Sequence, residues 1–406
     1  MPDNAEYEDS LDWGNLDAEQ LKAWENTPNT ARLFDSLRGS GYKFEEAMAD
    51  IVDNSIAAQA SIVNITLYVD PATQRTYVSI ADNGIGMTKT GLHNALKYGA
   101  DEREDKSSLG KFGLGLKLAS TAFCRRLEVI SRSQSEGEVW RGILDLDGME
   151  QAKAPVTPVV EPDLFGLGLL DEVASLGSGT VIRMLKLDRL KLANYSPKAR
   201  SYQDAELSKL VQTLKSHFSV VFQRFLDPAF SDVQNVKIYL NGEPIEPWDP
   251  FCLPETESPS YRKKIYLNPE DENGPWFELK AYILPRLEDF KDRELANKSR
   301  MLTNYQGFYV YRENRLINTP VWFDGRNRDV HSNIARIDFS FSHEFDTELG
   351  LSFRKDEIHP AGEIQKMLNA FAVTVVKFAN ETYRKGIASS KNFCTKGLGI
   401  SNLYPG

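Results

Sequence analysis

Glycines recur at close spacing between residues 82 and 115, next to patterns of regular structure. DNGIGM at 82–87 directly follows a strand pattern, and GKFGLG at 110–115 directly precedes a helix pattern. Glycine lets the main chain approach a ligand closely, and the free N–H groups at a helix start bind anions. The two loops together predict a pocket lined by main chain. A β-turn at Asn83-Gly84 is the simpler alternative for the first loop, but it does not account for Gly86. A flexible surface loop is the alternative for the second.

An amphipathic helix is predicted over 44–58, because apolar residues recur there at helical spacing. This helix places Asp50 and Asn54 four residues apart on one face. The amide oxygen of Asn54 could ligate a divalent ion without opposing the charge of a bound triphosphate. Asp50 could direct a water at the terminal phosphate as a general base. Taken alone, such a polar pair is also typical of a solvated helix face.

Further patterns divide the chain into α+β regions. The segments 61–69 and 76–81 predict a hairpin of strands, and a long helix is predicted over 204–226. We expect an N-terminal arm at 1–27, a first domain at 28–190, a second domain at 191–390 and a tail at 391–406. The other expected helices are 92–98, 116–123 and 363–384, and the other expected strands are 127–132, 138–145, 179–185, 235–240, 277–284, 306–312 and 335–342.

The composition excludes several classes of protein. Hydrophobic residues make up 41% of the 406 residues and charged residues 26%, which is typical of globular chains. Cys124, Cys252 and Cys394 lack the spacing of a zinc site or a disulfide framework. No stretch reaches the roughly 20 apolar residues needed to span a bilayer, and the start is acidic, so we expect a cytoplasmic protein with no membrane partner.

The motifs occur in a characteristic order: a helix with D-x-x-x-N, a strand ending in D-x-G-x-G, a glycine-rich loop, and then Gly179-Thr180 in GSGTVIRM. In this order they resemble the GHKL superfamily, which includes DNA gyrase B, the large heat-shock ATPases, histidine kinases, MutL and the MORC proteins. The resemblance implies an α+β chain with a Bergerat-fold ATPase domain, a mixed sheet backed by helices that binds ATP and Mg²⁺ under a mobile lid. It covers roughly residues 28–385 and is strongest over 44–120.

The resemblance also implies roles for individual residues. The residue matching Asn54 ligates magnesium, the one matching Asp82 reads adenine, and Thr180 supports that aspartate. The residues implied to bind the nucleotide are Asn54, Asp82, Gly84, Gly86, Met87, Gly110, Lys111, Phe112, Gly113, Leu114, Gly115 and Thr180. Lys111 and Lys117 lie near the second loop and suit phosphate oxygens.

One position departs from the family pattern. The general base of the family is a glutamate four residues before the asparagine, where this chain has Asp50. The shorter carboxylate predicts slow hydrolysis. Glu46 is a less suitable substitute, because it would lie farther from the metal.

The second domain resembles the transducer domain of gyrase B, MutL and MORC proteins through GFYVYRENRLI at 307–317. In those relatives a cation of this domain contacts the γ-phosphate. Lys355 in LGLSFRKDEIHP is our candidate for this role, and Arg354 is the competing one. An exposed lysine near a strand end is the simpler interpretation of Lys355.

The function expected from the resemblance is an ATP-driven clamp, in which ATP closes the lid and supports a homodimer. A nucleotide-gated binding or chaperone-like module with little turnover is the alternative. A histidine kinase is disfavoured, because the first histidine, His93, lies inside the nucleotide region. DNA and a protein client both remain open as partners. A basic run in the second domain could contact phosphates, but acidic residues interleave with it and the net charge is -10. The basic run comprises Arg262, Lys263, Lys264, Arg286, Lys291, Arg293, Lys298 and Arg300.

Overall fold

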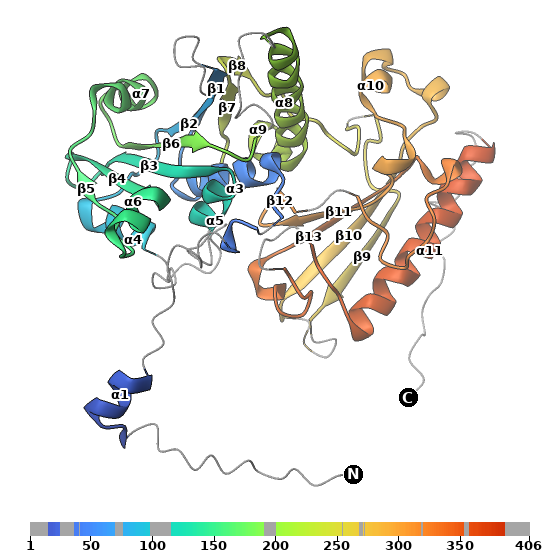
Figure 1. Cartoon of the computed structure of the whole chain (residues 1–406). Helices are drawn as coiled ribbons and strands as arrows, with labels where there is room; N and C mark the ends of the chain where they lie inside the picture. Colours follow the sequence, from blue (N-terminus) through green and yellow to red (C-terminus); the bar gives the residue numbers. More distant parts are fainter. Residues whose placement is uncertain are drawn as a thin grey trace.

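Within the described residues, the chain forms two α+β units, which lie next to each other in Figure 1. Each unit is built on its own β-sheet with its own hydrophobic core. The fold class is therefore the α+β architecture predicted from the sequence. The computed structural model describes residues 15–24, 36–39, 41–69, 76–97, 115–190, 200–253, 255–267, 271, 273–317, 320–352 and 357–385.

The first unit contains an eight-stranded mixed sheet within the described part of the chain, in the order β5-β4-β3-β6-β2-β1-β7-β8. Neighbouring strands pair antiparallel except β1 and β7, which run parallel. The strands are β1 (Ile62–Val69), β2 (Thr76–Asp82), β3 (Cys124–Arg132), β4 (Val139–Asp145), β5 (Val159–Val160), β6 (Gly179–Leu187), β7 (Lys237–Leu240) and β8 (Glu243–Pro244).

Helices cover both faces of this sheet. Strand β1 shows why, because Val63, Ile65 and Leu67 are buried on one face while the residues between them are only half-buried. The face of Val63 packs against α3, α4, α5, α8 and α9, and α7 packs on the opposite face. The helices are α3 (Phe44–Ala57), α4 (Lys89–Leu96), α5 (Gly115–Thr121), α6 (Leu146–Ala152), α7 (Leu164–Ala174), α8 (Arg200–Val221) and α9 (Gln223–Leu226).

Strand β7 belongs to a different sheet from the one predicted. The sequence places a strand near 235–240 in the second domain, whereas the structure pairs it with β1 of the first sheet. The Asn241 side chain extends this pairing, since it accepts from Leu67 N at 2.8 Å and donates to Leu67 O at 3.0 Å. This pairing joins residues that are far apart in the sequence, which a local pattern does not reveal. The first sheet therefore continues past the expected boundary at residue 190.

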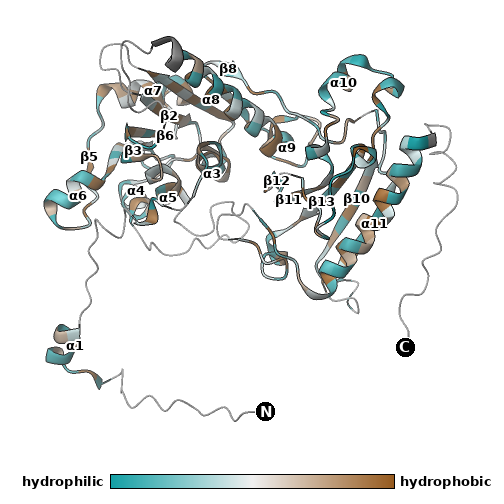
Figure 2. Cartoon of the chain, turned by 45° about the vertical axis from the view of Figure 1, so that its right-hand side comes forward, coloured by the Kyte–Doolittle hydropathy of each residue, from teal (hydrophilic) through white to brown (hydrophobic). Residues whose placement is uncertain are grey.

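The second unit contains a five-stranded sheet in the described residues, in the order β12-β11-β13-β10-β9. Helix α11 packs against this sheet. Hydrophilic and hydrophobic residues alternate along the helix (Figure 2). The strands are β9 (Tyr261–Tyr266), β10 (Trp276–Ile283), β11 (Gly307–Arg312), β12 (Arg315–Leu316) and β13 (Ala335–Phe341), and the helices are α10 (Arg293–Lys298), α11 (Gly362–Lys385) and the short 3-10 turns Leu287–Asp289, Thr303–Tyr305, Val330–Ser332 and His343–Phe345.

Helix α1 (Ala18–Trp24) lies in the expected N-terminal arm and contains no buried residue, with the Trp24 side chain 55% exposed. It stands apart from both sheets in Figure 1. Among the described residues, no helix has the length and hydrophobicity required to cross a membrane.

The two units meet in polar contacts beside α9. Arg224 of α9 lies 3.0 Å from the Asp338 carboxylate of β13 and donates to Ser340 Oγ at 2.9 Å. Its guanidinium also stacks over the Tyr311 ring at 3.6 Å. Arg224 and Asp338 are both buried, so their contact is shielded from solvent.

Candidate functional site

Helix α3 presents Asp50 and Asn54 on one face, as the sequence predicts. The Asn54 side-chain amide donates to the main-chain oxygen of Asp50 at 2.9 Å. This bond turns the amide oxygen of Asn54 away from the helix backbone. Among the described residues, no group donates to that oxygen, so it can serve as a hard ligand for a divalent cation.

Asp82 lies at the end of β2 and is only 3% exposed. Its carboxylate accepts from the Ser55 hydroxyl at 2.7 Å and from Gly84 N at 3.0 Å. Burial raises the pKa of Asp82, while hydrogen bonds from Ser55 and from the main chain of Gly84 and Thr180 oppose that rise. A buried carboxylate surrounded by donors can accept one more hydrogen bond, such as that of an exocyclic amino group.

The two glycines that follow Asp82 lie so close to neighbouring main chain that a side chain would not fit. A Cβ on Gly84 would lie 2.7 Å from the main-chain oxygen of Ala58. Gly86 has a positive φ of 66°, and a Cβ there would lie 1.9 Å from the main-chain oxygen of Arg132. The loop is therefore pressed between the end of α3 and strand β3, which a simple turn would not require. This contact explains the second glycine of the motif.

Hydrogen bonds fix the same loop to the sheet. The Asn83 side chain accepts from the main-chain N–H groups of Ser61 and Ile62, both at 2.9 Å. Met87 N donates to Ser131 Oγ at 2.9 Å. These contacts come from the start of β1, which is next to β2 in the sheet, and from β3, which lies beyond β6 on the other side of β2. The loop is therefore held from both sides.

Thr180 lies in register with Asp82 on the neighbouring strand β6. Its hydroxyl is 2.9 Å from Ser131 Oγ, and the Ser131 hydroxyl donates to Gly179 O at 3.0 Å. A Cβ on Gly179 would lie 2.2 Å from the main-chain oxygen of Asp82. The Gly-Thr pair thus allows β6 to approach β2 at the point where Asp82 projects.

Part of the predicted site lies outside the described residues, and one prediction is wrong. Gly115 begins α5, whereas Gly110, Lys111, Phe112, Gly113 and Leu114 are not described, and neither are Arg354 and Lys355. Lys117 is fully buried, and its ammonium donates to the main-chain oxygens of Ala95 at 3.0 Å and Lys97 at 2.8 Å. This lysine caps the end of α4 and is not presented to a phosphate.

Asp50 is contacted by a residue of the second unit, and the local sequence pattern does not predict this contact. Arg315 of β12 donates to Asp50 Oδ1 at 3.1 Å and lies 2.7 Å from Asp53 Oδ2. The Tyr42 hydroxyl donates to the other Asp50 oxygen at 2.9 Å. Burial opposes the charge on Arg315, but the attraction of Asp53 and Asp50 outweighs it and raises the pKa of Arg315. The side chain of Asp53 is buried and that of Asp50 is 16% exposed.

The available signal for this contact was the spacing of Asp50 and Asp53. Two acids three residues apart on a helix that is otherwise largely buried need a cation nearby, because an isolated buried carboxylate is costly. The sequence alone does not identify that cation, since Arg315 follows Asp53 by 262 positions.

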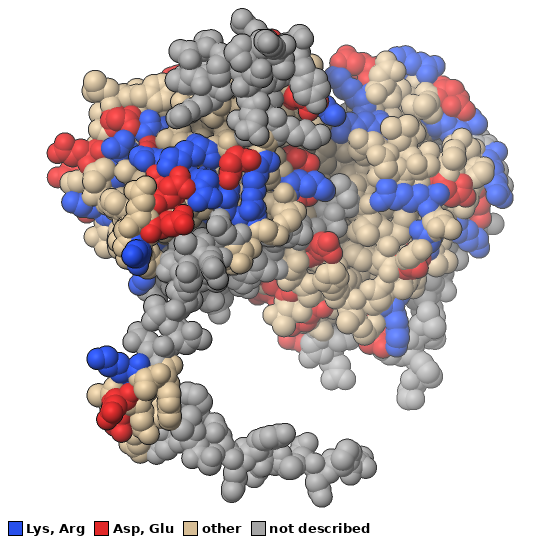
Figure 3. All heavy atoms as spheres, in the orientation of Figure 1, with Lys and Arg blue, Asp and Glu red and all other residues tan. Residues whose placement is uncertain are grey.

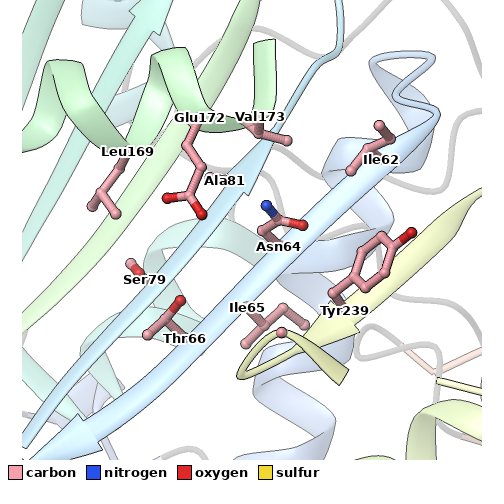
Figure 4. A pocket seen from close by; sticks show the side chains of 11 residues that line it. Ile62, Asn64, Ile65, Thr66, Ser79, Ala81, Leu169, Glu172, Val173 and Tyr239 are labelled. Atoms are coloured by element: carbon pink, nitrogen blue, oxygen red, sulfur yellow. The ribbon is translucent and has the colours of Figure 1, made fainter. Parts of the chain in front are cut away.

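Two hollows lie near these elements. A cavity of about 310 Å³ lies between the two units beside Asp50, and its lining includes Tyr42, His217, Trp248 and Arg315. A second cavity of about 320 Å³ lies between the first sheet and α7, on the face of the sheet that α7 covers. Figure 4 shows Asn64 of β1 and Glu172 of α7 projecting into this second hollow.

Within the described part of the chain, three of the eight residues in the basic run of the second unit pair with acids. Arg286 contacts Asp289 at 2.7 Å, Lys298 contacts Glu294 at 2.5 Å, and Lys291 contacts Glu257 at 3.5 Å. On the face drawn in Figure 3, basic and acidic residues are interspersed over both units. These pairings fit the simpler interpretation of a solvated surface.

Residues 42–180 match the family of histidine kinase-, DNA gyrase B- and HSP90-like ATPases. This part of the chain therefore belongs to the GHKL superfamily of ATPases. The chain is also similar to the DNA mismatch repair protein MutL of Histophilus somni (strain 2336), at 30% identity over 152 residues. That match covers 36% of this chain and 23% of the relative.

Proposed function

We propose that the chain binds ATP-Mg²⁺ in the first unit and hydrolyses it slowly, as part of a nucleotide-driven clamp. The observation that carries this proposal is the environment of Asp82. A buried carboxylate accepts from Ser55 and from the N–H of Gly84, inside a loop whose glycines leave no room for side chains. Such a group suits the amino group of adenine, and the superfamily is one of ATPases.

Within this proposal the described residues take distinct roles. Asp82 accepts a hydrogen bond from adenine, with Thr180 supporting it from β6. Gly84, Gly86 and Met87 shape the wall beside the base. Asn54 ligates Mg²⁺ through its amide oxygen. The loop at 110–115, which includes Lys111, cradles the phosphates and closes as a lid.

Hydrolysis is assigned to Asp50. An ionised carboxylate one helical turn from the metal ligand can orient a water and accept its proton. Lys355 is proposed to contact the γ-phosphate and report it to the second unit, with Arg354 as the competing residue. ATP would then close the lid and favour a homodimer, with DNA, including foreign DNA, as one possible client class.

A second candidate is a nucleotide-gated module with little turnover and a protein client. It is favoured by the short carboxylate of Asp50, which stands where the family pattern has a glutamate. The two candidates differ in the rate of phosphate release and not in nucleotide affinity.

Steady-state phosphate release and the binding of a fluorescent ATP analogue distinguish these candidates when the wild type and Asp50→Asn are compared. We expect both proteins to bind the analogue with similar affinity. We expect the variant to release phosphate roughly 10²- to 10⁴-fold more slowly, the usual contribution of a general base. Equal release by both proteins would remove Asp50 from the mechanism, and absent binding would end the nucleotide proposal.

A further inference from the structure

Arg315 connects the second unit to the helix that carries Asp50. It lies on β12, a strand that pairs with β11 at the edge of the second sheet. Its side chain leaves that sheet and reaches α3, with Nε at 2.8 Å from Asp53 Oδ1 and a terminal nitrogen at 3.1 Å from Asp50 Oδ1. One guanidinium therefore contacts both acids of the helix face. All three side chains are largely shielded from solvent.

The chemistry of these contacts suits orientation of a carboxylate. A planar guanidinium offers donors in a fixed fork, so a bond to Asp53 fixes the direction of the donor that reaches Asp50. The Tyr42 hydroxyl donates to the second oxygen of Asp50 at 2.9 Å. With a donor on each oxygen, the Asp50 side chain has a defined rotation. A carboxylate oxygen has more than one lone pair and can accept from a water as well as from a protein donor.

We propose that Arg315 is a positioning residue through which the docked second unit holds Asp50 in the orientation needed for hydrolysis. This inference rests on the proposed ATPase function. A carboxylate one methylene shorter than glutamate must be aimed more strictly to direct a water. Arg315 supplies that aim only while β12 lies against α3. Turnover thereby depends on the contact between the units, whereas nucleotide binding at Asp82 and Asn54 does not.

The chain offers a matched control for Arg315. Arg312 pairs with Arg315 in register across the β11–β12 hairpin. Its guanidinium binds Asp346 of its own unit, with Nε at 2.7 Å from Oδ1 and a terminal nitrogen at 2.9 Å from Oδ2. Arg312→Gln therefore breaks a buried arginine–aspartate pair of the same kind without touching α3.

The test compares kcat, KM and analogue affinity for the full chain carrying Arg315→Gln, Arg315→Lys or Arg312→Gln. We expect Arg315→Gln to lower kcat roughly 10- to 100-fold, the usual effect of losing a group that orients an active residue, with analogue affinity unchanged. Arg315→Lys should recover part of kcat, because a lysine keeps the charge but not the fork. Arg312→Gln should keep a kcat close to that of the wild type.

Loss of Arg315 leaves Asp53 buried without its cation, which can unfold the chain. The double variant Arg315→Gln with Asp53→Asn removes that uncompensated charge. It should show the same fall in kcat as Arg315→Gln but unfold at a higher temperature than that single variant. The inference is overturned if Arg315→Gln or the double variant keeps the wild-type kcat, or if Arg312→Gln loses as much. A wild type that binds the analogue but releases no phosphate would instead defeat the proposed hydrolysis itself.

Discussion

Arg315 Nε lies 2.7 Å from Asp53 Oδ2, although 262 positions separate the two residues in the sequence. Asp53 immediately precedes Asn54, the proposed metal ligand, and Arg315 belongs to the other sheet. The contact means that the helix carrying the proposed phosphate chemistry is also part of the interface between the units. Motions of one unit and the geometry of the other are physically linked at this pair.

Replacing Asp82 by asparagine should weaken ATP binding. The amide keeps one acceptor oxygen but presents an NH₂ group to one of the two donors, because Ser55 and Gly84 donate to different oxygens of the carboxylate. Losing a hydrogen bond to a charged acceptor costs about 1.5–3 kcal/mol, or roughly 10- to 150-fold in Kd. Titration with a fluorescent ATP analogue measures this. Asp147→Asn, which alters an acid paired with Arg125 outside the site, is the control and should bind normally.

The glycine at position 86 should be far less tolerant of alanine than the glycine at 137. Both have positive φ, at 66° and 72°, but a Cβ at Gly137 meets nothing within 4 Å, whereas one at Gly86 collides with Arg132 O. Gly137→Ala should cost about 1–2 kcal/mol of unfolding free energy, the strain of a left-handed residue. Gly86→Ala should cost more and also weaken analogue binding. Urea unfolding of both variants measures the difference, and equal losses would show that the contact with β3 is unimportant.

Acid should destabilise the chain partly through His217, which lies at the junction beside Arg315. Burial, with the charges of Arg315 and Lys43, lowers the pKa of His217 from 6.5 to about 3. Above pH 6.5 the imidazole is neutral in both the folded and the unfolded chain, so it does not affect stability there. As the pH falls from 6.5 towards 3, His217 becomes protonated in the unfolded chain but stays neutral in the folded chain. The free energy of unfolding therefore decreases.

Between pH 7 and pH 5 this loss should reach about 2 kcal/mol, at roughly 1.4 kcal/mol for each pH unit below 6.5. Urea unfolding at both pH values measures it. His217→Gln should remove that part of the pH dependence, and the exposed His93→Gln should leave it in place. A pH dependence identical in all three proteins would show that His217 is not the group responsible.

A non-hydrolysable ATP analogue should convert the protein from monomer to dimer if the clamp proposal is correct. Light scattering of the full chain with saturating analogue and Mg²⁺ measures the mass directly. The Asp82→Asn variant provides the control, since it should need a higher analogue concentration for the same shift. A mass that stays constant at full occupancy of the site would contradict the clamp.

The local elements of the site could be predicted from the sequence because their signals are local. The helix expected over 44–58 is α3 (Phe44–Ala57), and the hairpin expected at 61–81 is β1 and β2. Gly86 was singled out because a turn did not explain it, and the structure supplies the reason in Arg132 O.

Other elements escaped prediction for identifiable reasons. Helix α7 (Leu164–Ala174) contains Gly166 and Gly168, which weaken a helix pattern, yet Gly166 lies directly over Ile130, where a Cβ would be 3.1 Å from that side chain. Strand β9 (Tyr261–Tyr266) carries a basic run that resembles a solvated surface, and Lys264 packs over the Trp276 ring at 3.9 Å. Both depend on partners that lie elsewhere in the chain. The same is true of Arg315.

The pairing of β1 with β7 has a consequence for how the chain reaches its fold. Leu67 and Asn241, which bind each other through the main chain of one and the side chain of the other, are 174 positions apart. During synthesis, the edge of β1 stays unpaired until the ribosome has released the chain beyond residue 241. Contacts over such distances form slowly, and an open strand edge can pair with other chains in the meantime. A fragment that ends near residue 190 lacks β7, so the edge of β1 would stay unpaired and the fragment should aggregate. A fragment that extends past Ile245 contains β7, which pairs with that edge.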